Sequence, residues 1–436
     1  MRPWSALAQA THAAFDPEGF FQARVRRDGD PFRIAVPGLG AVLLTGHPEG
    51  AEQLFAAPPA TFEAVPRNPV EPLLGPGSMI LLDGDRHRAE RKLVMPALHG
   101  DRMRTYGAII QDAAAEALAG VAVGDVVDVQ RLTQAITLQV IVRAIFGVED
   151  AERRRAVHAA VVALLDAYTA PLMLVPGLRR RLAGLSPWAR FERARARFDV
   201  LLRDEVAARR QTAGAGAGRE DILSLLLGLR YDDGAPMRDD AVLDELRTLL
   251  VAGHETTATA LAWALHFVHR DDALAAALRA EVAADDRPEA LAKAPLLGAT
   301  CSEALRLHPV VPIVLRRLRT PFELRGVPVP AGAVVGVAVS VLHARPEVWP
   351  EPARFAPARF LDRRYTPFEY APFGGGHRRC LGAAFAGYEM RIVLGTLLAR
   401  AGFAATSTRR VRPVTRSITT GPGRRLRLRR IAAAAA

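Results

Sequence analysis

The sequence has 436 residues, half of them hydrophobic and 24% charged, with a formal net charge of +12; this is an ordinary globular composition, and the length alone suggests two or three domains. The chain lacks both an apolar run of about 18 residues and the apolar stretch of a secretory signal, so neither a membrane-spanning helix nor export is expected, and a cytoplasmic location is favoured. Its arginines are spread along the chain without aromatic interleaving or zinc-finger spacing, so nucleic-acid binding is not expected.

The first half of the chain changes from strand-like to helical patterns. Residues 1–60 mix short strand-like runs, such as 41–45, with turns. From residue 84 to about 210 helical periodicity prevails, with breaks at Pro96, Pro171, Pro176 and Pro187. The Ala-Gly repeat at 212–218 has the composition of a flexible linker between helices. It follows a helix rather than a strand, so it lacks the context of a dinucleotide-binding loop.

The second half begins with a long helix and ends in short strands. Leucines recur at helical spacing over 239–270, and Asp239 and Asp240 are acids suited to the start of a helix. Residues 310–341 alternate between prolines and short apolar runs, which predicts strands. The alternating arginines of 424–430 indicate an edge strand. We therefore expect a mainly α protein with a smaller β region.

Two cysteines are present, and their surroundings differ. Cys301 lies in an apolar helical run, as a buried and inert cysteine would. Cys380 lies among glycines and arginines directly before an Ala-rich helical run. Glycines allow close backbone approach, and cations and a helix N-terminus favour thiolate. The segment 373–382 therefore predicts a loop that presents one thiolate.

Several uses of that thiolate can be weighed from the residues. Two cysteines cannot supply an iron–sulfur cluster or a four-cysteine zinc site, and a disulfide is not expected without a secretory signal. A cysteine nucleophile would need a basic partner, and His377 is three residues upstream. No third group that could orient His377 is evident nearby, which weakens this alternative.

Two further motifs combine acids with a hydroxyl or a guanidinium. Residues 252–257 place Glu255 beside Thr256 within the long helix, where an acid and an alcohol could relay protons; a merely irregular helix with a polar patch is the alternative. Glu303 and Arg306 are neighbours at i, i+3 on a helix, a spacing that usually gives an exposed pair worth little.

These segments resemble, in order over residues 84–390, the motifs of the cytochrome P450 family. Residues 373–382 match Phe-x-x-Gly-x-Arg-x-Cys-x-Gly in full, residues 252–256 match (Ala/Gly)-Gly-x-(Asp/Glu)-Thr, and 303–306 match Glu-x-x-Arg. The one departure is Ala358, which stands where the family's Pro-Glu-Arg-Phe segment has Glu. The resemblance implies the cytochrome P450 fold, with a triangular helical body and a long central I-type helix. It also implies one domain over 1–436, with a β-containing part at about 1–80, a helical body at 84–310, and β segments with the thiolate loop at 310–436.

The same resemblance implies roles for individual residues around haem b. Cys380 would bind the iron, Thr256 would hydrogen-bond the bound dioxygen, and Glu255 would support proton delivery. Glu303, Arg306 and Arg359 would form a structural triad that holds the thiolate loop. Further cofactor contacts would come from His87, Arg91, Arg316, Arg378, Phe373, Gly376 and Gly382. The substrate pocket would be lined by the segment 65–82 and by Leu249, Ala252, Val311, Ile313, Val314 and Ile418.

The implied activity is that of a haem-thiolate monooxygenase acting on a hydrophobic small molecule, such as a fatty acid, alkane, terpenoid or polyketide. The chain has no flavin domain and no cysteines for a cluster, so electrons would come from a ferredoxin or flavodoxin with its reductase. We expect this partner to dock on a basic side that includes Arg363, Arg364, Arg378 and Arg379. A peroxide-driven or non-oxidative haem-thiolate enzyme is an alternative, as is a non-catalytic haem carrier or sensor.

Overall fold

The computed structural model describes residues 6–36, 39–65, 68–98, 100, 102–147, 151–211, 221–416 and 419–432. The chain forms two compact units. The first, called unit 1 below, comprises Met1–Ala64, Ala114–Thr133 and Thr256–Ala436; the second, unit 2, comprises Val65–Ala113 and Gln134–Glu255. No helix of the described ranges is long and apolar enough to cross a membrane. The linker expected at 212–218 and the pocket residue Ile418 lie outside the described residues.

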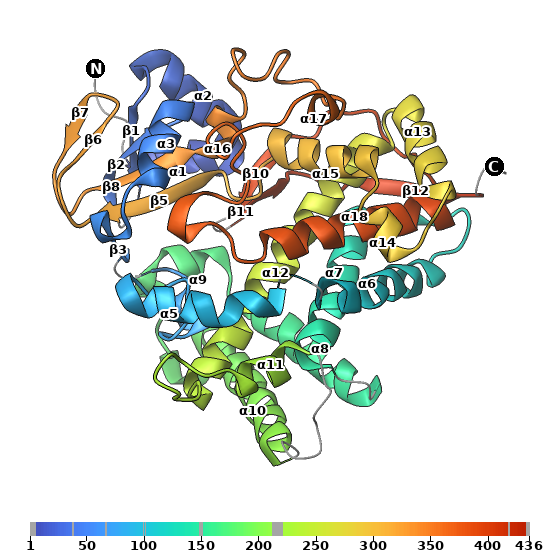
Figure 1. Ribbon diagram of the computed structural model, residues 1–436, viewed down its shortest axis with the longest axis horizontal. Helices are drawn as coiled ribbons and strands as arrows, with labels where there is room; N and C mark the ends of the chain where they lie inside the picture. The colour runs from blue at the N-terminus through green and yellow to red at the C-terminus, as the bar shows by residue number, and fades with distance from the viewer. Residues whose placement is uncertain are drawn as a thin grey trace. The chain divides into compact units, whose positions relative to one another are not determined.

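Unit 1 is built around a five-stranded sheet with the strand order β1-β2-β8-β5-β3 (Figure 1). The strands are β1 (Phe32–Val36), β2 (Gly40–Thr45), β3 (Phe62–Glu63), β5 (Ile313–Leu318) and β8 (Val334–Ala338). Both faces are covered, because Phe20 and Phe21 pack on one face and Leu54 and Phe55 on the other. The central strand β8 is accordingly buried at every position. The strands predicted at 41–45 and within 310–341 are confirmed.

The N-terminal residues are more helical than their sequence pattern predicts. Helices α1 (Ala6–Phe15), α2 (Pro17–Asp28) and α3 (Pro48–Ala56) lie within the region expected to mix strands and turns. The sequence does contain a signal for the start of α2. The Asp16 carboxylate accepts a hydrogen bond from the Gly19 N–H at 3.1 Å, and Pro17 occupies the first turn. The prediction was wrong here because the apolar residues of α2 are too few to show a period.

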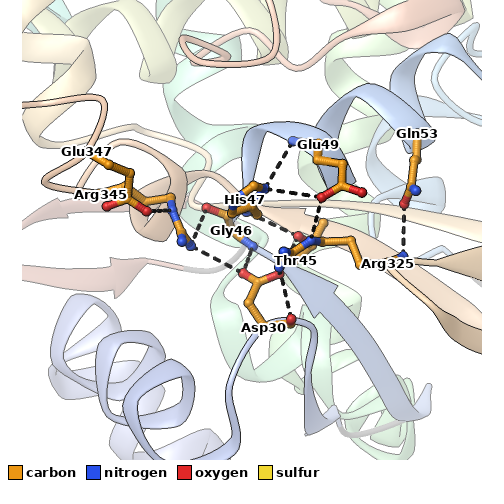
Figure 2. Close-up of polar contacts among 9 residues, drawn as sticks. All are labelled: Asp30, Thr45, Gly46, His47, Glu49, Gln53, Arg325, Arg345 and Glu347. Carbon is orange, nitrogen blue, oxygen red and sulfur yellow. Dashed lines mark hydrogen bonds and ion pairs between the residues drawn. The ribbon is translucent and has the colours of Figure 1, made fainter.

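A buried carboxylate fastens the end of β2 to two later segments of unit 1 (Figure 2). Asp30, whose side chain is 6% exposed, accepts hydrogen bonds from the Thr45 hydroxyl and the Gly46 N–H, each at 2.7 Å. Arg325 donates to the same carboxylate at 2.9 Å, and the Arg345 guanidinium lies 3.7 Å from it. The Asp30 carboxylate therefore connects the end of β2 to the segments that carry Arg325 and Arg345, whose side chains are partly exposed.

The remaining strands of unit 1 form small sheets. β12 (Arg427–Ile431) pairs with both β4 (Val126–Asp128) and β9 (Gly402–Ala405), so the edge strand predicted from the arginines of 424–430 is wrong. Alternation shows that one face is solvated, but it cannot show whether a strand has one neighbour or two. The other pairs are β6 (Phe322–Leu324) with β7 (Val327–Val329), and β10 (Pro413–Arg416) with β11 (Thr419–Pro422).

Besides α1, α2 and α3, unit 1 contains the helices that follow the long helix α12. They are α13 (Asp272–Ala283), α14 (Pro288–Leu291), α15 (Pro295–Leu307), α16 (Val339–Leu342), α17 (Arg359–Asp362) and α18 (Ala383–Arg400). Helices α13, α14 and α15 all pack against α18, whose buried residues lie on nearly every side of it. The packing places α18 in the interior of the unit's helical part.

Unit 2 is helical, as predicted for residues 84–210. It contains α4 (Glu71–Leu74), α5 (Gly84–Val94), α8 (Ala151–Ala167), α9 (Ala170–Leu174), α10 (Pro187–Gln211) and α11 (Ile222–Gly228). Three helices contribute residues to both units: α6 (Arg102–Ala119), α7 (Val129–Phe146) and α12 (Asp239–Val268). The long helix predicted at 239–270 is confirmed as α12. The mainly α fold with a smaller β region is confirmed as well.

Candidate active site

The loop before α18 exposes a single thiol. The Cys380 N–H donates to the Phe373 carbonyl at 2.9 Å, and the Gly374 N–H donates to the Ala371 carbonyl at 3.0 Å. The loop is therefore closed by its own backbone hydrogen bonds. Cys380 is exposed, and α18 begins three residues later with Gly382 at its N-cap. A helix N-terminus favours negative charge, so this position suits a thiolate ligand.

Glycines in this loop are required by its packing on α3. Gly376 has φ +66°, a conformation that L side chains rarely adopt. A Cβ atom at Gly376 would overlap the carbonyl oxygen of Phe55, and one at Gly375 would overlap the Phe55 ring. Gly374 is also left-handed, with φ +65°, and lies against the side chain of Val314. The loop can thus approach β5 and the end of α3 only with glycine at these positions.

The second cysteine has the opposite environment. Cys301 is buried in α15, and burial raises the pKa of its thiol to about 12. A thiol with that pKa remains protonated at neutral pH and makes a poor ligand or nucleophile. The prediction that Cys301 is buried and inert is confirmed. The contrast leaves Cys380 as the thiol suited to chemistry.

A fully buried carboxylate organises the segment that leads to the cysteine loop. Glu303 accepts hydrogen bonds from Arg306 at 2.6 and 2.8 Å, from the Ala356 N–H at 2.9 Å, and from Arg359 at 3.1 Å. The structure therefore brings the three predicted triad residues together. Arg306 also donates to the carbonyls of His343, Pro352 and Arg354, and its guanidinium lies 5.3 Å from the centre of the Trp349 ring.

His343, which was missed from the sequence, connects this cluster to the cysteine loop. Burial and the Arg306 charge lower the pKa of His343 to about 3, so the ring is neutral. A neutral ring can donate from Nδ1 to the Arg306 carbonyl at 3.2 Å and accept at Nε2 from the Ala371 N–H at 2.9 Å. Ala371 is the residue whose carbonyl closes the first turn of the loop. No sequence pattern marks His343, because its partners are distant in the chain.

Two arginines of unit 1 are placed so that an anion would stabilise them. Arg316 lies on β5, and Arg378 lies two residues before Cys380. Burial, followed by the Arg378 charge, lowers the pKa of Arg316 to about 10. Two carboxylates close to these guanidinium groups would offset both effects. The donor set of unit 1, one exposed thiol with two neighbouring arginines, therefore fits haem, with its iron and two propionates.

The remaining predicted cofactor residues belong to unit 2 or to the loop itself. His87 and Arg91 lie at i, i+4 on α5, so they share one side of that helix; His87 is buried and Arg91 partly buried. Phe373 is partly buried and supplies the carbonyl that binds the Cys380 N–H.

The acid–alcohol motif is held by polar side chains of α7. In unit 2, the Gln134 amide donates to Glu255 Oε2 at 2.8 Å, and the Thr137 hydroxyl lies 2.9 Å from His254 Nδ1. In unit 1, Thr133 Oγ1 lies 2.9 Å from the Ala258 carbonyl, and the Gln130 amide donates to Thr259 at 3.1 Å.

The four α7 residues have the spacing i, i+3, i+4, i+7, which places them along one face of the helix. They were missed, although a polar stripe in an otherwise apolar helix is a signal that could have found them.

The long helix continues through the motif. Glycine and threonine are weak helix formers, yet α12 is uninterrupted from Asp239 to Val268, through Gly253 and the adjacent threonines. Burial lowers the pKa of His254 to about 4, so His254 is neutral beside Glu255. Thr256 and Glu255 are both partly buried. The motif thus offers one carboxyl group and one hydroxyl on successive residues of a continuous helix.

The apolar residues predicted for the substrate pocket have varied surroundings. Leu249 is buried and Ala252 is exposed, both on α12. Val311 is partly buried. Ile313 packs with the core on one face of the five-stranded sheet and Val314 with the core on the other, as expected for successive residues of β5. Of these two, Val314 is the one next to the cysteine loop.

Comparison with known proteins identifies the family. The family model described as cytochrome P450 matches residues 16–424. The chain belongs to the cytochrome P450 family. Members of this family bind haem b and are monooxygenases. The exposed thiol, the glycine-dependent loop and the paired arginines of this P450 suit that cofactor.

Relatives of this P450 come from bacteria. It is 36% identical to cytochrome P450 135B1 of Mycobacterium tuberculosis over 413 residues, which cover 94% of this chain and 86% of the relative. Cytochrome P450 138 of the same organism is 35% identical over 86% of this chain and 82% of the relative. The structure is similar to that of retinoic acid-bound cyanobacterial CYP120A1, with a TM-score of 0.83, 25% sequence identity and 95% of both chains covered. The P450 fold predicted from the motifs is confirmed.

Replacing Cys380 by His tests the thiolate assignment. We expect the Cys380→His protein to lose the carbon monoxide difference spectrum that is typical of thiolate ligation, because imidazole donates less electron density to the iron. The Cys301→Ala protein should keep this spectrum and serves as the matched control. A thiolate-type spectrum in Cys380→His would contradict the assignment.

Proposed function

We propose that this P450 inserts one oxygen atom of O₂ into a hydrophobic small molecule, such as a fatty acid, terpenoid or polyketide. The observation that carries the proposal is the exposed Cys380 thiol in a glycine-dependent loop at the start of α18. The predominantly apolar residues assigned to the pocket favour an apolar substrate. The structurally similar cyanobacterial P450 has retinoic acid bound, and the body of that molecule is apolar.

The haem, when bound, supplies oxygen activation, and a thiolate ligand favours cleavage of the O–O bond in P450 enzymes generally. Cys380 would be that ligand, and Arg316 and Arg378 would neutralise the propionates. The hydrogen bond from the Cys380 N–H to the Phe373 carbonyl fixes the position of the sulfur relative to α18. The cluster of Glu303, Arg306 and Arg359 would keep the loop in place through His343 and Ala371.

Proton delivery would use the acid–alcohol pair of α12. Thr256 would donate a hydrogen bond from its hydroxyl to the substrate dioxygen, and Glu255 would replace the proton that this hydroxyl gives up. The Gln134 amide donates to Oε2 of Glu255 at 2.8 Å, which orients the carboxyl group.

A titration of the ferric enzyme tests the substrate class. Fatty acids, terpenes, steroids and macrolides would be added separately while absorbance is recorded. We expect one apolar class to shift the haem from low to high spin, because a ligand in the pocket displaces the water at the iron. A shift with polar sugars or amino acids, and with no apolar class, would contradict the proposal.

Replacing Thr256 by Ala separates the monooxygenase from its alternatives. With the substrate found by titration, product formation by Thr256→Ala should fall by about 10²-fold or more while oxygen consumption continues, since a positioned proton donor typically contributes this much. Thr256→Ser keeps the hydroxyl and should retain coupled turnover. Full coupled turnover of Thr256→Ala would favour a peroxide-driven or non-oxidative enzyme, and no turnover of any variant would favour a haem carrier or sensor.

The electron donor is proposed to be a separate ferredoxin or flavodoxin with its reductase, in the cytoplasm where such proteins are available. Its docking surface would include Arg364 and Arg379, which are exposed. Arg363 is less available, because it forms an ion pair with Glu369 and its guanidinium lies 4.7 Å from the centre of the Tyr365 ring. That arrangement is consistent with Arg364 carrying more of the docking charge than Arg363.

Charge reversal tests this surface. We expect Arg364→Glu, alone or with Arg363→Glu, to slow reduction by an acidic ferredoxin about tenfold at low salt, because opposite charges steer the encounter. Substrate binding should be unchanged. The matched control is Arg33→Glu, at an exposed position of β1. An unchanged reduction rate in both Arg364 variants would contradict docking at this surface.

A further inference from the structure

A hollow of about 430 Å³ in unit 1 belongs to none of the groups assigned to haem or substrate. It is bordered by α2, the end of α12, the end of α15, α16 and the loop residues Arg410 and Val411. Binding sites for small organic molecules commonly have volumes of about 300–1,000 Å³. The hollow is therefore large enough for such a molecule.

Arginines from three separate segments line this hollow. They are Arg26 on α2, Arg270 after α12, and Arg410. Its one carboxylate, Glu18, is engaged with His308 at 2.7 Å, and the arginine at its base, Arg306, is engaged with Glu303. In the described part of the chain, no carboxylate lies within ion-pair distance of Arg26 or Arg410. The lining consequently carries excess positive charge.

A second hollow of about 330 Å³ shares Arg410 with the first. Its other lining residues are Arg412, Val414, Gly423 and Arg424, so it contains no acid. Among the described residues, neither Arg412 nor Arg424 has an ion-pair partner. Arg410, Arg412 and Arg424 are all exposed, and their like charges around one small space would be stabilised by a bound anion. Arginine binds phosphate oxygens through pairs of parallel N–H groups, which makes phosphate the anion that this set suits best.

The larger hollow also offers features for an uncharged molecular body. Phe267, Leu307 and Val411 are apolar residues of its lining, and the Phe267 ring is held by stacking on Phe355 with ring centres 4.4 Å apart. Burial, with the nearby Arg270 charge, lowers the pKa of His266 to about 4, so this ring is uncharged at neutral pH. The buried Ser340 hydroxyl has no hydrogen-bond partner in the described part of the chain. A ligand group that binds this hydroxyl would remove an unsatisfied buried polar atom.

We propose that the two hollows together bind a phosphorylated small organic molecule. Its phosphate groups would lie on Arg410, Arg412 and Arg424, and its organic part would lie between Phe267 and Ser340. The site is distinct from the predicted haem and substrate residues, and it does not depend on the proposed oxidation. Its occupation would therefore make this P450 a protein with a second, non-substrate ligand.

Calorimetric titration of the haem-loaded protein tests the proposal, with adenosine diphosphate and inorganic pyrophosphate as probes. At moderate salt we expect saturable binding of one adenosine diphosphate per chain. Arg410→Ala and Arg424→Ala should each weaken it by at least about tenfold, the loss typical of a charged hydrogen bond to phosphate. Arg409→Ala, at the exposed neighbour of Arg410, should change it by less than about twofold and is the matched control.

Comparison of the two probes distinguishes binding of the organic part from binding of the phosphate groups. Tighter binding of adenosine diphosphate than of pyrophosphate, with a loss in Ser340→Ala for the former alone, would support the full proposal. Equal affinity for both probes would overturn the organic subsite. An equal loss in Arg409→Ala and Arg410→Ala would show unspecific charge attraction and overturn the site, as would no saturable binding. Unchanged far-ultraviolet circular dichroism and melting temperatures of the variants would show that they fold, and this control is independent of the haem assignment.

Discussion

The buried ion pair between Glu303 and Arg306 is the interaction on which the cysteine loop depends. Glu303 is completely buried, and Arg306 is nearly so. Removing one partner of such a pair typically costs about 3–5 kcal/mol, because the other charge is left unpaired in the interior. Each remaining N–H group of Arg306 therefore has to find a carbonyl, and the carbonyls lie in the segment from His343 to Arg354. The backbone that precedes the cysteine is fixed by this requirement.

The exposed thiol follows from a second constraint, the close approach of backbone to backbone. The loop passes over Phe55 so closely that glycine is required at Gly375 and Gly376. Since the loop is closed by hydrogen bonds of its own, Cys380 is directed outward rather than into the apolar interior that raises the pKa of Cys301. The two cysteines of one chain thus differ in burial, and Cys380 in addition lies at the N-terminus of α18.

The large positive charge serves different purposes in different places. Some arginines are structural, such as Arg306 and Arg325, which are paired with buried carboxylates. Others, such as Arg316, are placed where an anion would stabilise them. Arg26, Arg410, Arg412 and Arg424, which line the two hollows, form a third group with no ion-pair partner among the described residues. The net charge therefore does not identify a binding partner of the protein. The arginines that lack a carboxylate partner indicate where an anion could bind.

The family, the long helix α12, the strands of 313–338 and the cysteine that suits haem could all be predicted from the sequence, because each rests on local spacing or on a contiguous motif. The tertiary structure was needed to show that His343 connects Arg306 to Ala371, that Gln134 orients Glu255, and that β12 is a central strand. It also separated Ile313 from Val314, which lie on opposite faces of one sheet. These features depend on contacts between residues far apart in the chain, and a hydrogen bond of this kind leaves no periodic or local trace in the sequence.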